Sequence, residues 1–325
     1  MRREILSSRR PCLLKYSSIP GRRGAVSGRK EKAMEEQTII HISDDFDMDR
    51  IADSGQCFRW EKAEPDTYRI LAGRSCLYMK ALGEDRYVLD CNRKAFEGFW
   101  QDYFDLRENY GKIRALIDPE KDPFLFAASR AQKGIRILRQ DPWEMLITFI
   151  ISQNRNIPAI KRSVELLSEA CGEKMTDTMG RTYYAFPDPE TAASLTEAEL
   201  KACRLGYRCR YVKAAAQAIL EGSIDLPSLA DADEDRTLEA LTGILGVGVK
   251  VASCVSLFGL HHTDAFPVDV WMKRILKERY PEGYPFERYS PYNGIFQQYM
   301  FAYYRQRAGE KERLPKEREE RGFEG

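Results

Sequence analysis

The sequence predicts an α+β protein, with an N-terminal antiparallel β-sheet domain followed by a mostly helical body. Up to about residue 91, short runs rich in β-branched and aromatic residues alternate with turn clusters, which is typical of antiparallel strands. From about residue 93 the apolar residues recur with helical spacing instead. With 43% hydrophobic and 31% charged residues, the composition is that of a globular chain.

Four segments are expected along the 325 residues. They are a basic disordered extension (1–33), a β-rich domain (34–128), a helical domain (129–308) and a charged tail (309–325). The extension carries a charge of +8, so the remainder carries −7 of the net +1. Any surface for nucleic acid must therefore be local. An upstream start codon before Met34 is favoured over a transit peptide.

Individual elements follow from local signals. Strands are expected at Gln37–Ile42, Tyr68–Ala72, Cys76–Ala81 and Tyr87–Cys91, and an aromatic-rich last helix at Pro291–Arg307. Helices with apolar faces are expected at Phe96–Tyr103, Tyr110–Ile117, Pro123–Ala131, Ala159–Ala170 and Arg208–Glu221. Asp141 and Pro142 are placed as N-cap and first residue of another strongly apolar helix, and Thr196 as the cap of a further one.

The cysteines argue against a structural metal. None of the eight forms a CxxC pair, so neither a zinc site nor an iron–sulfur cluster is expected, and no cofactor is required. No run of about 18 apolar residues is present, so no membrane span is predicted. Reduced thiols in a cytoplasm are the expectation.

Residues 241–271 carry the strongest chemical signal. Gly246 and Gly248 flank Val247 between two helical runs, Arg236–Leu245 and Val251–Leu260. This pattern is typical of a helix–hairpin–helix, in which the backbone N–H groups at a helix start can bind a DNA phosphate. From the local pattern alone, a tight corner between packed helices is equally compatible.

Lys250 and Asp269 are the candidate catalytic residues. Lys250 stands at the start of the second helical run, beside apolar residues, where an amine nucleophile could act. Asp269 lies in the apolar setting Pro267-Val268-Asp269-Val270, where a carboxylate can offset positive charge on a reacting sugar. The plain alternatives are a solvated lysine and a helix N-cap aspartate, and the cap is compatible with catalysis.

The stretch LTGILGVGVKVASCVSLFGL…PVDVW resembles the catalytic motif of the helix–hairpin–helix (HhH-GPD) DNA glycosylases. From about Phe46 to Arg305 the chain resembles the eukaryotic-type 8-oxoguanine DNA glycosylases, which also occur in bacteria. The resemblance implies excision of 8-oxoguanine from duplex DNA. Lys250 would attack C1′ and form a Schiff base, and β-elimination would then nick the strand. Asp269 would stabilise the oxocarbenium-like transition state.

The resemblance also implies roles for residues far from the hairpin. Gly55, in the stretch SGQCFRW, matches the glycine whose carbonyl accepts the N7–H that distinguishes 8-oxoguanine from guanine. The remaining base pocket would be formed by Cys254, Pro267, Trp271, Gln297 and Phe301. The DNA contacts would come from Asn154, Asn156, Tyr207 and Arg208 together with Gly246, Val247 and Gly248. Flipping a base costs a few kcal/mol of stacking, so such a plug and wedge are required.

Three positions depart from the family pattern. Leu245 stands where proline is usual, and Ala159 stands where eukaryotic members have a second arginine for the opposite base. Trp271 replaces a common histidine, which together with Ala159 indicates the bacterial branch. The preference for cytosine opposite the lesion should therefore be weaker. The chain is expected to act as a monomer, and a monovalent cation at the hairpin stays an open question.

Two other functions remain in competition. One is a glycosylase for alkylated purines, although those relatives generally lack the lysine that Lys250 matches. The other is a non-catalytic helix–hairpin–helix module, which would leave Lys250 and Asp269 unexplained.

Overall fold

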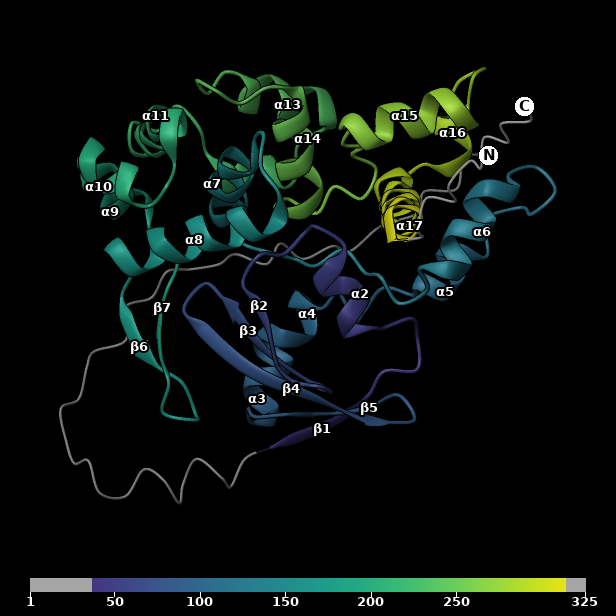
Figure 1. Ribbon diagram of the computed structural model, residues 1–325, viewed down its shortest axis with the longest axis horizontal. Coiled ribbons are helices and arrows are strands. Elements are labelled where there is room, and N and C mark those ends of the chain that lie inside the picture. Colours follow the sequence, from purple (N-terminus) through teal and green to yellow (C-terminus); the bar gives the residue numbers. More distant parts are fainter. Residues whose placement is uncertain (1–36, 314–325) are drawn as a thin grey trace, which may run out of the picture. The chain divides into compact units, whose positions relative to one another are not determined.

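The computed structural model describes the backbone of residues 37–313 and the side chains as far as residue 308. The predicted basic extension (1–33) and residues 314–325 of the predicted charged tail lie outside the described residues. The α+β fold class is confirmed, because a five-stranded antiparallel sheet is followed by a mostly helical body (Figure 1). None of the helices in the described residues is long and apolar enough to cross a membrane.

The N-terminal sheet has the strand order β1-β5-β4-β3-β2, with every neighbouring pair antiparallel. Its strands are β1 (Thr38–His41), β2 (Trp60–Glu64), β3 (Thr67–Ala72), β4 (Ser75–Gly83) and β5 (Arg86–Leu89). Four of them were predicted, and β2 was missed. Only Trp60 of this edge strand is buried, so its sequence lacks the alternation that marks a half-buried strand.

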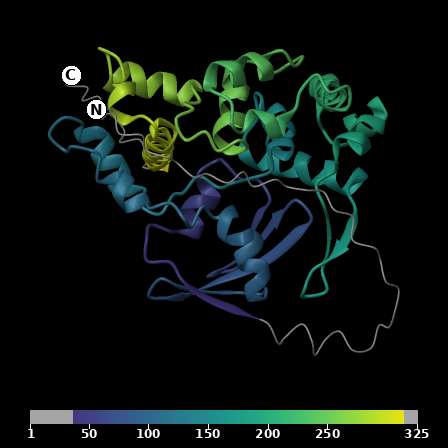
Figure 2. The same cartoon turned by 180° about the vertical axis from the view of Figure 1, so that it is seen from behind.

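One face of the sheet is covered by a continuous helical segment (Figure 2). It consists of α3 (Arg93–Ala95), a π-helical turn η1 (Phe96–Trp100) and α4 (Gln101–Tyr103). Its aromatic rings pack on strand residues in a cluster of their own, and the indole of Trp60 donates to the Tyr103 hydroxyl at 2.9 Å. A helix was expected over 96–103, but the π turn within it was not.

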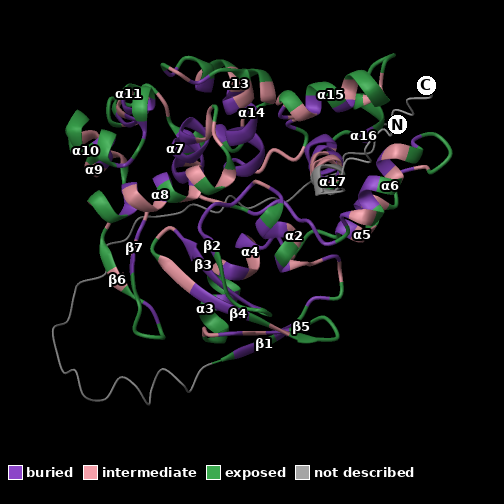
Figure 3. Ribbon diagram, viewed as in Figure 1, coloured by how far each residue is buried: buried purple, intermediate pink, exposed green. Residues whose placement is uncertain are grey.

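The helical body has its own core around α7 (Pro142–Ser152), nine of whose residues are buried (Figure 3). As predicted, Asp141 caps this helix by accepting from the Glu144 N–H, and Pro142 opens it. The other helices up to residue 229 are α2 (Met48–Asp53), α5 (Tyr110–Arg114), α6 (Pro123–Ala131), α8 (Ile157–Cys171), α9 (Pro189–Ser194), α10 (Glu197–Ala202), α11 (Cys209–Leu220), which follows the 3₁₀ turn η2 (Gly206–Arg208), and α12 (Leu226–Leu229).

The remaining helices are α13 (Glu234–Thr242), α14 (Val249–Phe258), α15 (Val270–Arg279), α16 (Phe286–Tyr289) and α17 (Asn293–Arg313). The expected end of the last helix at Arg307 is wrong, because α17 continues into the predicted tail as far as Arg313. The predicted cap at Thr196 is confirmed as a capping box with Glu199.

A hairpin inside the helical body was not predicted. Strands β6 (Lys174–Thr176) and β7 (Thr182–Tyr184) pair only with each other. Asp177, in the loop between them, forms a buried ion pair with Arg69 at 2.9 Å and accepts from the Tyr78 hydroxyl at 3.0 Å. These partners are about a hundred residues away in the sequence, so no local signal indicated the hairpin.

Candidate active site

The helix–hairpin–helix consists of α13, a tight turn and α14. Both helices begin two residues earlier than predicted, because Asp233 caps α13 and Gly248 is the N-cap of α14. The turn requires glycine at Gly246, where φ is +86° and an added Cβ would lie 2.2 Å from the Tyr211 ring. Val247 is buried beneath it and donates its N–H to the Ile244 carbonyl at 3.0 Å.

Gly248 differs from Gly246, because neither its backbone conformation nor a close neighbour in the described residues requires a glycine there. Its φ is −93°, and a Cβ added there would meet no atom within 4 Å. It precedes α14 without a side-chain cap, so no side chain accepts from the N–H groups of the first helical turn. Free N–H groups at the positive end of a helix dipole form an anion site. The open space and the unused donors suit a close phosphate.

Lys250 lies in the first turn of α14, half-buried, with its Nζ 5.4 Å from the centre of the Phe149 ring. One turn further along the helix, Cys254 is buried. Burial raises the pKa of the Cys254 thiol, while the positive charge of Lys250 opposes that shift and the carboxylate of Asp269 adds to it. The predicted nucleophile, the predicted carboxylate and one wall of the predicted base pocket therefore lie together.

Asp269 is the N-cap of α15, accepting from the N–H groups of Trp271 at 3.0 Å and Met272 at 2.8 Å. Both bonds use Oδ1. The alternative interpretation as a cap is therefore correct as geometry. Within the described residues Oδ2 accepts no hydrogen bond, and the cap holds the carboxylate in one orientation, close enough to act electrostatically on Cys254. A capping carboxylate fixed in this way can also act electrostatically on a ligand.

The residues predicted for the base pocket come from the segment around Gly55, from the stretch before α15 and from α17. Gly55 has φ +84°, and a Cβ added to it would lie 3.5 Å from the Phe301 ring of α17. On the same helix, the buried amide of Gln297 donates to the Pro267 carbonyl at 3.0 Å. The Trp271 ring packs against Tyr304, with 6.1 Å between the ring centres. Contacts between residues some 240 positions apart thus bring Gly55 to the last helix.

Gln56 holds the Gly55 turn in place, and sequence reasoning missed it. This fully buried side chain donates to Ser54 Oγ and to the Arg136 carbonyl, and it accepts from the Leu138 N–H, each at 2.8 Å. The backbone carbonyl of Gln56 accepts from the side-chain amide of Gln140 at 2.9 Å. The available signal was a glutamine next to the apolar run Cys57-Phe58, because a polar side chain in such a setting needs internal partners.

The predicted DNA contacts outside the hairpin lie at the ends of α7 and α8 and at η2. Asn154 has φ +52° and donates to the Tyr207 hydroxyl at 3.2 Å, so the predicted plug and the predicted wedge touch. Arg208 is buried under the Tyr207 ring, its Cζ 4.4 Å from the ring centre. Asn156 caps α8 by accepting from the Ala159 N–H at 3.0 Å.

Gln153 connects these residues to the hairpin and was also missed. Its amide donates to the Gly246 carbonyl at 3.0 Å, and its carbonyl accepts from the Arg208 guanidinium. One residue thus fixes the Asn154 turn, η2 and the glycine turn relative to one another. Tyr211, whose ring fills the space above Gly246, is a further member that no motif indicated.

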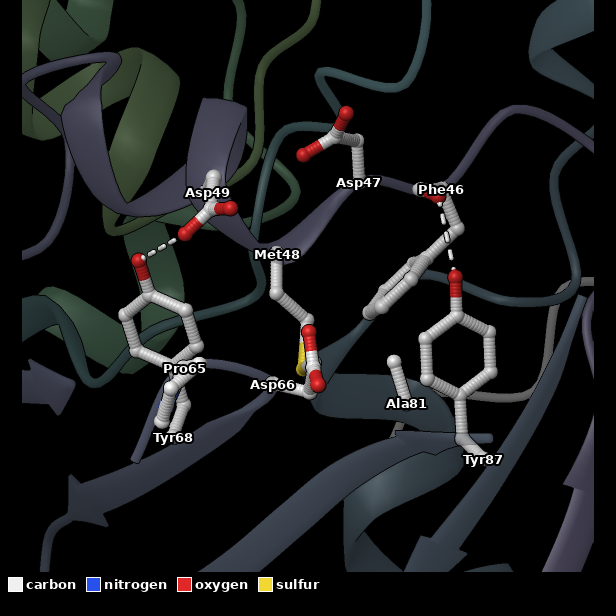
Figure 4. Close-up of a pocket in the computed structure, with 9 residues that line it drawn as sticks. All are labelled: Phe46, Asp47, Met48, Asp49, Pro65, Asp66, Tyr68, Ala81 and Tyr87. Carbon is white, nitrogen blue, oxygen red and sulfur yellow. Dashed lines mark hydrogen bonds between the residues drawn. The ribbon is translucent and has the colours of Figure 1, made fainter. Parts of the chain in front are cut away.

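A separate hollow lies over the N-terminal sheet (Figure 4). It is lined by Phe46, Asp47, Met48, Asp49, Pro65, Asp66, Tyr68, Ala81 and Tyr87, none of which was predicted as a site residue. Asp49 is engaged by Lys62 and Tyr68, both at 2.6 Å, and Asp47 caps α2. The carboxylates of Asp47 and Asp49 thus serve the fold. Among the described residues, no group of three His, Cys, Asp or Glu side chains could hold a metal ion.

Comparison with known proteins agrees with this geometry. Residues 147–282 match the family model for HhH-GPD superfamily base excision DNA repair proteins, and residues 39–146 match the model for the N-terminal domain of 8-oxoguanine DNA glycosylase. The fold and the hairpin site are therefore those of a helix–hairpin–helix DNA glycosylase.

Relatives narrow this class to one family. The chain is 33% identical to the N-glycosylase/DNA lyase of Saccharomyces cerevisiae, over 71% of this chain and 67% of the relative. It is 28% identical to a probable N-glycosylase/DNA lyase of Methanothermobacter thermautotrophicus, over 73% of this chain and 83% of that relative. A crystal structure of the 8-oxoguanine glycosylase/lyase of Clostridium acetobutylicum, with DNA that has cytosine opposite 8-oxoguanine, is also similar. The TM-score is 0.79 and the identity 33%, over 84% of this chain and 97% of that one. The chain belongs to the 8-oxoguanine DNA glycosylase family.

Proposed function

We propose that this protein excises 8-oxoguanine from duplex DNA and cleaves the strand at the resulting abasic site. Membership of a family of N-glycosylase/DNA lyases supports both activities. The observation that carries the proposal is the convergence of Lys250 and Asp269 on Cys254, at the start of a helix whose first N–H groups are open.

In the proposed mechanism Lys250 is the nucleophile. Its neutral amine attacks C1′ of the extruded nucleotide, the N-glycosidic bond breaks, and the electron pair of that bond leaves with the base, which takes up a proton. The amine bonded to C1′ then gives up one proton, the C1′–O4′ bond breaks with its electron pair on O4′, which is protonated, and a protonated Schiff base forms. Loss of a proton from C2′ then breaks the C3′–O bond, so that the 3′ phosphate leaves by β-elimination. Asp269 stabilises the positive charge that develops on the sugar. No step needs a metal or cofactor, since the amine replaces an activated water.

Recognition of the lesion is assigned to the pocket between Gly55 and α17. The Gly55 carbonyl would accept the N7–H that 8-oxoguanine has and guanine lacks, so guanine would leave that acceptor unpaired. The Gln297 amide gives one N–H to Pro267, which leaves its second N–H for the edge of the base. The Phe301 ring and Cys254 supply the apolar walls. Asn154 and Tyr207 would fill the space left by the extruded base.

Borohydride trapping on a duplex with 8-oxoguanine opposite cytosine tests the nucleophile. The wild-type protein should give a covalent adduct, Lys250→Gln should give none, and Lys273→Gln, which changes an exposed lysine of α15, should trap normally. An undiminished adduct with Lys250→Gln, or none with the wild type, contradicts the mechanism. A duplex carrying an alkylated purine tests the competing substrate class.

Asp269→Asn separates capping from catalysis. Asparagine caps helices as well as aspartate does, so the melting temperature should change little. The single-turnover excision rate should nevertheless fall by about a hundredfold or more, as for the loss of one transition-state charge partner. If stability and rate fall together, Asp269 serves the fold alone.

The finer expectations are part of the same proposal. The protein acts as a monomer, which sedimentation at micromolar concentration tests. With Ala159 in place of a second arginine, excision rates against the four opposing bases should differ less than in eukaryotic members. A sharp preference for cytosine would show that Ala159 does not matter.

A further inference from the structure

Three arginines gather beside the Asn154 turn without a carboxylate partner. Arg155 follows Asn154 directly, and its guanidinium donates to the Ser163 hydroxyl and to the backbone carbonyl of Arg204. Arg208 donates to the carbonyls of Leu205, at 3.1 Å, and Gln153. Every acceptor in this arginine cluster is neutral, and within residues 37–308 none of the three arginines forms an ion pair with a carboxylate.

The members of the arginine cluster repel one another. Burial lowers the pKa of Arg155, and the charges of Arg208 and Arg204 lower it further. Arg204 is exposed and its backbone has φ +61°, a conformation that non-glycine residues rarely adopt. The Nε of Arg208 is buried without a hydrogen-bond partner. Three close positive charges, together with a buried donor that no protein atom accepts from, favour the binding of an anion at this place.

The cluster also lies next to the proposed DNA-binding elements. The backbone carbonyl of Gln153 accepts from Arg208, and its side-chain amide donates to the Gly246 carbonyl. Gln153 therefore connects the arginine cluster directly to the glycine turn. Tyr207 stacks on Arg208 and contacts Asn154. Residues 34–325 carry a net charge of −7. A cluster of three arginines without a carboxylate partner is therefore unusual for this part of the chain, and it makes a local positive surface.

We propose that Arg155 and Arg204, supported by Arg208, bind a phosphate of the DNA backbone beside the Asn154–Tyr207 pair. The inference rests on the proposed function, since it presumes that this face meets DNA. A guanidinium has a planar fork of donors that matches phosphate oxygens, and the neutral contacts of Arg155 hold that fork in place. This phosphate contact would add to the one at the free N–H groups after Gly248. The duplex would then have two phosphate contacts, and Gln153, which bonds both Gly246 and Arg208, lies between them.

Salt-dependent binding of an undamaged duplex tests this proposal without using the excision reaction. Each phosphate contact contributes about 0.9 to the slope of log K against log salt concentration. Arg155→Gln and Arg204→Gln should each reduce that slope, together by no more than about 0.9 because they share one phosphate, and each should weaken binding equally for all sequences. Arg155→Lys should keep most of the slope. The matched control is Arg162→Gln on α8, because Arg162 already pairs with Glu169 at 3.6 Å.

Several results would overturn the proposal. An unchanged slope in both glutamine variants excludes a phosphate contact. A loss that depends on the base opposite the lesion assigns the arginines to base reading instead. A lower melting temperature with an unchanged slope assigns them to the fold. If inorganic phosphate alone stabilises the wild type as strongly as a duplex does, the cluster binds a free anion. Absence of excision activity with the expected slopes would contradict only the proposed function.

Discussion

Substitutions at the two glycines of the hairpin should have opposite effects on stability. Alanine at Gly246 would have to adopt φ +86°, which costs about 1 kcal/mol or more. Its Cβ would also lie 2.2 Å from the Tyr211 ring, and forcing such a contact costs about 1–3 kcal/mol. Gly246→Ala should therefore reduce the free energy of unfolding by about 2–4 kcal/mol.

Gly248→Asp should stabilise the protein. The residue has the φ and ψ of an N-cap, −93° and 175°, and its surroundings are open. An aspartate there would accept from the free N–H groups of α14 and interact with its dipole, which together contribute about 0.5–1 kcal/mol. The same carboxylate would repel a phosphate at this site by about 1–4 kcal/mol, so duplex binding should weaken about fivefold or more.

Urea denaturation and fluorescence anisotropy with a labelled duplex measure the two effects separately. Gly246→Ala should lower the denaturation midpoint, whereas Gly248→Asp should raise it while it weakens DNA binding. Equal destabilisation by both substitutions would refute the assignment of Gly246 to the fold. Unchanged DNA affinity in Gly248→Asp would refute a phosphate at the start of α14.

Two further predictions concern polar groups. Gln56→Leu leaves the Arg136 carbonyl and the Leu138 N–H unpaired, so unfolding should become about 2–4 kcal/mol easier and the excision rate should fall; unchanged chemical denaturation contradicts this. Burial opposes protonation of His262, but the Glu234 carboxylate, 3.8 Å from Nδ1, and the Ala230 carbonyl raise its pKa above the usual 6.5. Its stabilisation is therefore complete below about pH 6.5 and is lost as the pH rises through the folded value. Wild type and His262→Gln should differ more in melting temperature at acidic than at alkaline pH; the opposite order contradicts the assignment.

Several features could be predicted because their cause is local. Asp141 and Pro142 start α7, and Thr196 with Glu199 starts α10, as expected from capping and from the fixed φ of proline. Bounds shifted where a neighbouring residue offered a better cap, as Asp233 does for α13. The hairpin motif likewise placed Lys250 at a helix start from the sequence alone.

Features that depend on distant partners could not be predicted. The β6–β7 hairpin is fixed by the buried pair of Asp177 with Arg69, and β2 is held by its neighbour in the sheet. The supports of the site, Gln56 and Gln153, are single polar residues, and most of their hydrogen-bond partners lie 55 to 93 positions away. Neither residue type nor spacing indicates such partners.

By itself, the sequence determined four strands of the N-terminal sheet, the main helices, the glycine turn and the candidate residues Lys250 and Asp269, because propensity, capping and turn geometry act within a few residues. Only the tertiary structure decided that Gly55 lies beside Phe301, that Asp269 and Lys250 both lie close to Cys254, and that three arginines stand together without a carboxylate partner. These contacts join residues far apart in the chain. They form only when burial of the two hydrophobic clusters brings those segments together.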